Sequence, residues 1–92
     1  MARIVFEWDP PEDQQGNTFH LARHGITPAE AERVVRDPRN STSRSRSSTY
    51  PITFGRTKGG KFIAVVWSAT GANPLTVRVI TGYEVDPGEG AS

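Results

Sequence analysis

The run KFIAVVW at Lys61–Trp67 requires a fold that covers both faces of a β-strand. Its apolar side chains would point to both sides of an extended segment, which is typical of a central strand. The neighbouring segments Tyr50–Arg56 and Leu75–Thr81 instead alternate apolar and polar residues, as strands with one buried face do. Turn residues at Thr57–Gly60 and Ala72–Pro74 separate the three segments. The second half of the chain therefore predicts three consecutive antiparallel strands, with Lys61–Trp67 in the middle.

The first quarter of the chain predicts a strand followed by a helix. Arg3–Trp8 alternates apolar and polar side chains, and the Asp-Pro-Pro sequence at residues 9–11 stops the strand. Residues 12–24 are helical in their second half, and Gly25 suits the left-handed position that follows a helix. His24 would then lie in the last helical turn, where the helix dipole favours a positive charge.

A second helix begins at a capping box. Thr27 is the expected N-cap, Pro28 the first helical residue and Glu30 the third, which is the order that such a box requires. The helix should end at Asp37-Pro38, because the residue before a proline disfavours helical geometry. Residues 39–49 contain mainly serine and arginine and cannot form a core, so we expect a mobile loop.

These elements predict an α+β fold of order β-α-α-β-β-β. Two helices would pack on one face of a small antiparallel sheet, and the other face would carry Arg78. The 92 residues should form one domain over residues 1–85, with residues 86–92 as a disordered tail. Cysteine is absent, the first residues are acidic rather than apolar, and no window is apolar enough for a membrane span. We therefore expect a cytoplasmic protein without a membrane contact.

Charge is distributed unevenly along the chain. Residues 1–32 carry two basic and six acidic side chains, a sum of −4, and residues 62–92 sum to −2. Residues 33–61 carry eight basic side chains and one acidic, a sum of +7. Such asymmetry favours a polyanion as partner, with a solvated loop and helix face as the plain alternative.

Three side chains stand out as candidates for chemistry. His20 and His24 are four residues apart and share a helix face, so they could form an RNA-contacting pair, hold a metal or serve structure alone. Structure is the favoured interpretation for the pair, and His24 is the better functional candidate. Arg78 lies in the middle of a strand, where an unpaired charge is costly. It should either pair with an acid such as Glu7 or Glu84, or line a cleft that binds phosphate.

The order of several short motifs resembles the BrnT-type toxins of the RelE-like ribonuclease superfamily. The motifs are FEWD at residues 6–9, HGITPAEA at residues 24–31, Asp37-Pro38, Gly55-Arg56 and RVIT at residues 78–81. The resemblance covers residues 4–85. It implies a type II toxin with a RelE-like fold that cleaves RNA without a metal or cofactor. It also implies a hetero-oligomer with a DNA-binding antitoxin that neutralises the toxin.

RNA cleavage without a metal requires a base, an acid and cations that stabilise the charged phosphorane. We assign Arg78 to the phosphate, and His24 or Tyr83 to proton transfer. The remaining RNA-binding candidates are Arg56, Lys61, Tyr50, Arg44 and Arg46. Tyr50 and Tyr83 stand where members of the family usually carry arginines. This departure supports an alternative, a catalytically weak or inactive homologue that acts as a protein- or RNA-binding module.

Overall fold

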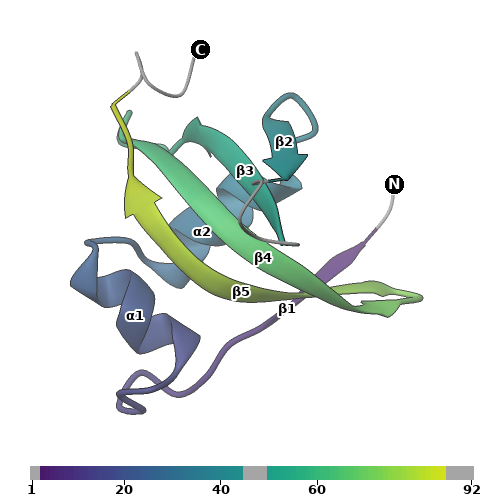
Figure 1. Cartoon of the computed structure of the whole chain (residues 1–92), viewed down its shortest axis with the longest axis horizontal. Helices are drawn as coiled ribbons and strands as arrows, with labels where there is room; N and C mark the ends of the chain where they lie inside the picture. The colour runs from purple at the N-terminus through teal and green to yellow at the C-terminus, as the bar shows by residue number, and fades with distance from the viewer. Residues whose placement is uncertain (1–2, 45–49, 87–92) are drawn as a thin grey trace.

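Two helices and five strands make up the computed structural model, which describes residues 3–44 and 50–86 (Figure 1). In chain order the elements are β1 (Ile4–Glu7), α1 (Asn17–Arg23), α2 (Pro28–Arg36), β2 (Ser41–Arg44), β3 (Pro51–Arg56), β4 (Phe62–Ala72) and β5 (Leu75–Glu84). The expected α+β class is thus confirmed. None of the described helices is long and apolar enough to cross a membrane.

The five strands form one mixed sheet in the order β1-β5-β4-β3-β2. The strands β2 to β5 pair antiparallel, and β4 is central, as KFIAVVW predicts. The first strand, however, pairs parallel with β5, so the expectation of a purely antiparallel sheet is wrong. Local alternation in Arg3–Trp8 indicates a strand but contains no information about its direction, which depends on the long connection to the rest of the sheet.

The strand β2 is an addition to the expected order. It lies within residues 39–49, for which the sequence predicted a loop, and residues 45–49 are outside the described part. Its sequence, STSR, has no apolar alternation, but β2 is an edge strand with exposed residues, and an edge strand needs no apolar face. One polar contact stabilises its pairing with β3, a hydrogen bond of 2.8 Å between the hydroxyls of Thr42 and Thr53.

Local signals determine the ends of both helices as expected. Gly25 has φ +73° and follows α1, whose C-cap residue is His24. At the start of α2 the Thr27 hydroxyl accepts a hydrogen bond from the Glu30 backbone N–H (3.2 Å), and the Glu30 carboxylate accepts one from the Thr27 backbone N–H (2.9 Å). The capping box and the end of α2 at Arg36, one residue before Asp37, are therefore confirmed.

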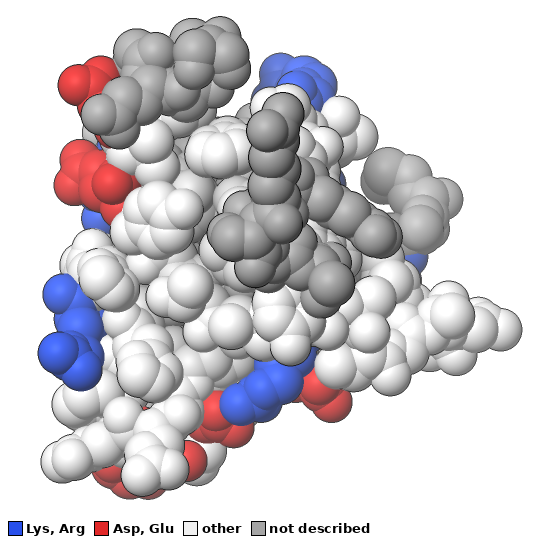
Figure 2. All heavy atoms as spheres, in the orientation of Figure 1, with Lys and Arg blue, Asp and Glu red and all other residues white. Residues whose placement is uncertain are grey.

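Both helices pack on one face of the sheet. The buried core joins helix residues to strand residues, namely Leu21, Ile26, Ala31 and Val34 with Ile63, Val65 and Val79. In Figure 1 the helices lie behind the sheet, and the opposite face points toward the viewer. Figure 2 shows this face: among the described residues in view, the basic and acidic side chains lie around its margin.

Candidate functional site

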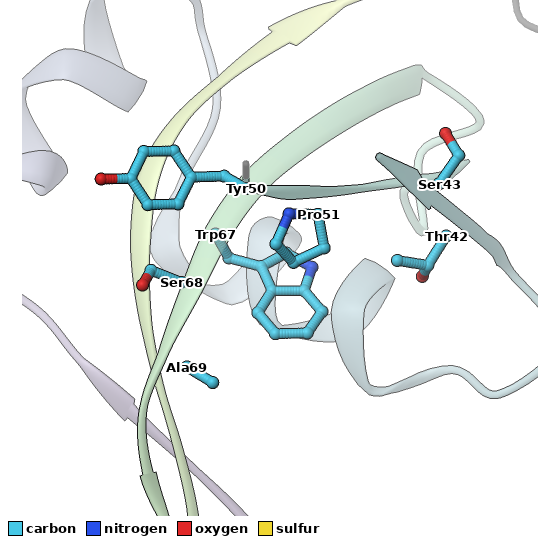
Figure 3. Close-up of a pocket in the computed structure, with 7 residues that line it drawn as sticks. All are labelled: Thr42, Ser43, Tyr50, Pro51, Trp67, Ser68 and Ala69. Carbon is cyan, nitrogen blue, oxygen red and sulfur yellow. The ribbon is translucent and has the colours of Figure 1, made fainter. Parts of the chain in front are cut away.

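The end of β3 that carries Pro51 borders a hollow of about 560 Å³ (Figure 3). Tyr50, Trp67 and Ser68 are among the residues that line it. The indole N–H of Trp67 donates to the Thr53 hydroxyl at 2.9 Å, so this part of the wall has its polar groups satisfied. Among the side chains that the structure describes, no Lys or Arg lines the hollow, and Tyr50, predicted to contact RNA, lies here.

The other end of β3 borders a hollow of about 620 Å³ with a different character. The strand β2 pairs with β3 only as far as Phe54, so Gly55 and Arg56 have no partner in β2. The end of α2 lies beside that edge. We call this hollow the arginine groove, and its chemically distinctive lining residues are Arg33, Asp37, Arg39, Phe54, Arg56 and Phe62. Three guanidinium groups and one carboxylate give it a formal charge of +2.

The cations of the arginine groove differ in how they are held. Arg33 is exposed and makes no hydrogen bond or ion pair with any residue in the described part of the chain. Arg56 donates to the Gly60 carbonyl at 2.8 Å, and its guanidinium lies over the Phe62 ring, 5.5 Å from the ring centroid. Arg39 binds both oxygens of Asp37, at 3.1 and 3.0 Å. This hydrogen bonding, together with the Arg39 backbone N–H, holds the pKa of Asp37 below its usual value.

An aromatic pair completes the groove. The rings of Phe54 and Phe62 are stacked with centroids 6.3 Å apart and an angle of 18° between their planes. Both side chains are only partly buried. Cations beside exposed aromatic faces are the combination by which proteins bind single-stranded nucleic acid, through phosphates and bases respectively.

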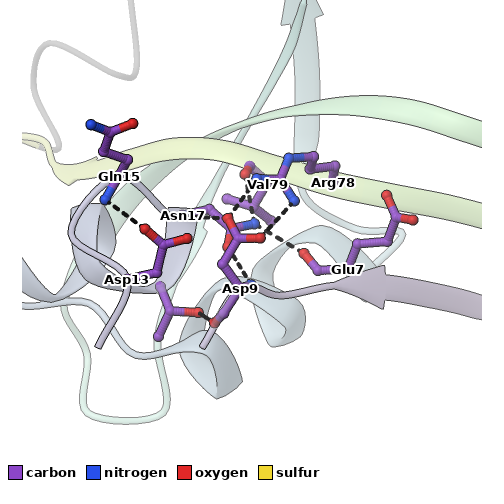
Figure 4. Close-up of polar contacts among 8 residues, drawn as sticks. Glu7, Asp9, Asp13, Gln15, Asn17, Arg78 and Val79 are labelled. Carbon is purple, nitrogen blue, oxygen red and sulfur yellow. Dashed lines mark hydrogen bonds and ion pairs between the residues drawn. The ribbon is translucent and has the colours of Figure 1, made fainter. Parts of the chain in front are cut away.

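Arg78 lies elsewhere, at the edge between β5 and β1 (Figure 4). Its two terminal nitrogens donate to the two carboxylate oxygens of Asp9, at 3.3 and 2.5 Å. Of the two alternatives for Arg78, the structure shows pairing with an acid, and the partner is Asp9 rather than Glu7 or Glu84. The hydrogen bond from Arg78, with a second from the Asn17 backbone N–H, lowers the pKa of Asp9, and Asp9 in turn raises the pKa of Arg78.

Asn17 holds this ion pair in place. Its side-chain oxygen accepts from the Asp9 backbone N–H at 2.9 Å, and its amide nitrogen donates to the carbonyls of Glu7 and Val79, each at 2.9 Å (Figure 4). The side chain is 3% exposed. Asn17 therefore joins β1, β5 and the start of α1, and sequence reasoning missed both Asn17 and Asp9. An unpaired arginine in the middle of a strand is unfavourable, so Arg78 itself was the signal that pointed to an acidic partner such as Asp9 as one alternative.

The predicted catalytic residues are not gathered at one point. Arg78 and Tyr83 are five residues apart on β5, so their backbones are separated by roughly 16 Å. His24 lies at the C-terminal end of α1, whereas Arg78 lies near its first residue, Asn17. The histidine that shares a small hollow of about 250 Å³ with Arg78 is His20.

The other predicted RNA-binding residues are also dispersed. The Lys61 ammonium donates to the Gly25 carbonyl and lies 3.7 Å from the Glu30 carboxylate, so it links β4 to the junction of the helices. Arg44 is the last residue of β2, and its side chain is outside the described part of the chain, as is all of Arg46. Among the predicted RNA-binding residues whose side chains the structure describes, Arg56 alone lines the arginine groove. No three His, Cys, Asp or Glu side chains within residues 3–44 and 50–86 gather to hold a metal ion.

Comparison of the sequence with known proteins gave no match, either among protein-family models or among curated proteins.

The ion pair of Asp9 with Arg78 predicts a specific response to acid. Because the pKa of Asp9 is lower in the folded protein than its usual 3.8, the ionised carboxylate stabilises the fold above that pH, and the contribution is lost as the pH falls through the folded value. We expect Asp9→Asn to lower stability at about pH 7 and to reduce the further loss between about pH 5 and pH 3. Urea unfolding at these pH values measures both effects.

Glu12→Gln is the matched control, because Glu12 is exposed and makes no hydrogen bond or ion pair within the described residues. It should leave the pH profile of the wild-type protein unchanged. An equally steep acid loss in the wild-type protein and in Asp9→Asn would contradict the prediction.

Proposed function

We propose that this chain is a BrnT-like toxin of the RelE-like class that acts on RNA and binds it through the arginine groove. The main support for this proposal is one observation: three arginines, Arg33, Arg39 and Arg56, surround a single hollow that also contains the Phe54–Phe62 pair. Guanidinium groups match phosphate geometry, and partly exposed aromatic rings stack on unpaired bases. The α+β fold and the motif order in the sequence support the toxin part of the proposal. A cytoplasmic location and neutralisation by an antitoxin are further parts of it.

A second candidate function is RNA binding without cleavage. The specific observation in its favour is the ion pair of Arg78 with Asp9, which occupies both ends of the guanidinium that we assigned to the phosphate. The distance from Arg78 to Tyr83, and the position of His24 at the far end of α1, also favour it. A homologue of this kind would bind RNA or a partner protein and leave the phosphodiester intact.

Binding to RNA tests what the two candidates share. Fluorescence anisotropy with a labelled single-stranded RNA should show binding that weakens with salt, because each phosphate contact releases counterions. Arg33→Gln and Arg56→Gln should each weaken binding about tenfold at low salt and reduce the salt slope by about one. Arg23→Gln, an exposed arginine on α1 that makes no contact within the described residues, should bind like the wild-type protein. Equal loss in all three variants, or no binding, would overturn the proposal.

Cleavage separates the two candidates. The chain would be expressed in bacteria without an antitoxin, and growth and the integrity of total RNA would be followed. Growth arrest with fragmented RNA, reduced in Arg33→Gln and Arg56→Gln, supports the toxin. Normal growth with intact RNA, from a chain that binds RNA in anisotropy, supports the second candidate.

A further inference from the structure

The arginine groove continues into a second hollow of about 560 Å³ around the C-terminal end of α2. Both hollows are lined by Arg33, Asp37 and Arg39, so they share a wall and open onto the same surface. The second hollow adds Ala29, Glu32, Arg36 and Pro38 to the lining, so its charged residues are three arginines and two carboxylates. Four arginines therefore follow one another from the edge of β3 to the outer side of α2, and the aromatic pair lies at the β3 end only.

Arg36, which lines the second hollow, is held in position by several contacts. Arg36 lies 5.0 Å above the centroid of the Phe6 ring, donates to the Ile4 carbonyl at 3.3 Å and contacts the Glu32 carboxylate at 3.3 Å. Glu32 is held in turn by the indole N–H of Trp8 at 2.7 Å. About half of the Arg36 side chain is exposed, and its guanidinium has donors that these contacts do not use. A cation held in this way loses little rotamer entropy when it binds a ligand.

We propose that the two hollows form one track for single-stranded RNA, with an unpaired base on the aromatic pair and successive phosphates along the arginines toward Arg36. This inference rests on the proposed function and names the substrate class of the same site. A duplex fits the track poorly, because its bases are stacked and paired and cannot reach Phe54 and Phe62. A mononucleotide or dinucleotide would occupy the arginine groove alone.

Asp37 lies at the wall that the two hollows share. Its carboxylate is paired with Arg39 in the free protein, and it is the one acidic side chain that lines both hollows among the described residues. A phosphate that approaches this point meets a negative charge and competes with it for Arg39. The track therefore predicts that Asp37→Asn binds single-stranded RNA more tightly than the wild-type protein, about threefold or more at low salt.

The test compares a single-stranded RNA of about eight nucleotides, the matching duplex and a dinucleotide. Ala29→Glu adds a negative charge to the second hollow at an exposed position on α2 and removes no contact. It should weaken binding of the longer single strand about tenfold and leave dinucleotide binding unchanged. Arg36→Gln should do the same, with circular dichroism to check its folding, since Arg36 also packs on Phe6. The single strand should bind at least tenfold more tightly than the duplex.

The failures of the two proposals are distinguishable. If no RNA binds, or if Arg33→Gln and Arg56→Gln have no effect, the proposed function itself fails. If those variants weaken binding while Ala29→Glu and Asp37→Asn do not change it, the arginine groove binds RNA but the track is refuted. Equal affinity for the duplex and the single strand would also refute the track.

Discussion

Replacement of Asn17 by alanine should lower the free energy of unfolding by about 3 kcal/mol, one of the two largest effects that we expect from any single substitution in this chain. The side chain makes three hydrogen bonds, to the Asp9 N–H and to the carbonyls of Glu7 and Val79. Because the site is buried, these backbone groups would lose their partner without gaining full access to water. The midpoint of thermal unfolding should fall by about 12 °C or more.

Asn40→Ala is the matched control for this prediction. The Asn40 amide donates to one backbone carbonyl, that of Val34 at 2.8 Å, and it connects residues six positions apart rather than separate strands. Its loss should cost about 1 kcal/mol. Thermal unfolding followed by circular dichroism measures both variants. If Asn17→Ala costs no more than Asn40→Ala, Asn17 does not hold β1 and β5 together as the contacts indicate.

The second large effect concerns the contact between α1 and β5. Leu21 is fully buried, and its replacement by alanine should cost about 3 kcal/mol through lost burial and an incompletely filled cavity. Gly82 lies directly beneath it: a Cβ at residue 82 would lie 2.9 Å from Leu21 Cδ2 and 3.2 Å from the Ala64 carbonyl oxygen. Gly82→Ala should therefore also destabilise the fold, by about 1 to 2 kcal/mol, because the added methyl overpacks the core.

The double variant Leu21→Ala/Gly82→Ala tests whether the two residues share one packing site. In Leu21→Ala the atom that the new methyl would meet is gone, so the methyl of Gly82→Ala fills part of the cavity. The double variant should be more stable than the sum of the two single effects by about 1 kcal/mol. Urea unfolding of the wild-type protein and the three variants gives this coupling energy. Strict additivity would mean that the two residues do not share one packing site.

Elements with a complete local signal could be predicted from the sequence. The capping box at Thr27, the glycine after α1 and the central position of KFIAVVW each depend on residues that are adjacent in the chain, and each is confirmed. The strand β2 and the parallel direction of β1 could not be predicted. Both are decided by the partner strand, and neither STSR nor RIVFEW contains information about its partner.

The candidate site also has a part that the sequence predicts and a part that it does not. The charge count located the basic segment over residues 33–61, but not which of its arginines converge. Arg33 and Arg39 line one hollow with Arg56 beside the part of β3 that β2 does not pair with, and the extent of that pairing is a property of the sheet. For Arg78 the sequence left an acidic partner and a phosphate-binding cleft as alternatives. It did not indicate Asp9, which lies 69 positions away and is brought near by the parallel pairing of β1.

The parallel pairing of β1 with β5 also has a consequence for how the protein is made. Ile4 lies opposite Leu75, so β1, the first of the described strands along the chain, has its only neighbour among them in β5, the last. On the ribosome, β1 and the Asp9–Asn17 contacts at its end must wait for β5, with apolar residues such as Phe6 uncovered. The sequence separation of these contacts also makes folding slow relative to a helical protein of similar size. Nascent chains halted before β5 should therefore remain sensitive to proteases at residues 4–8.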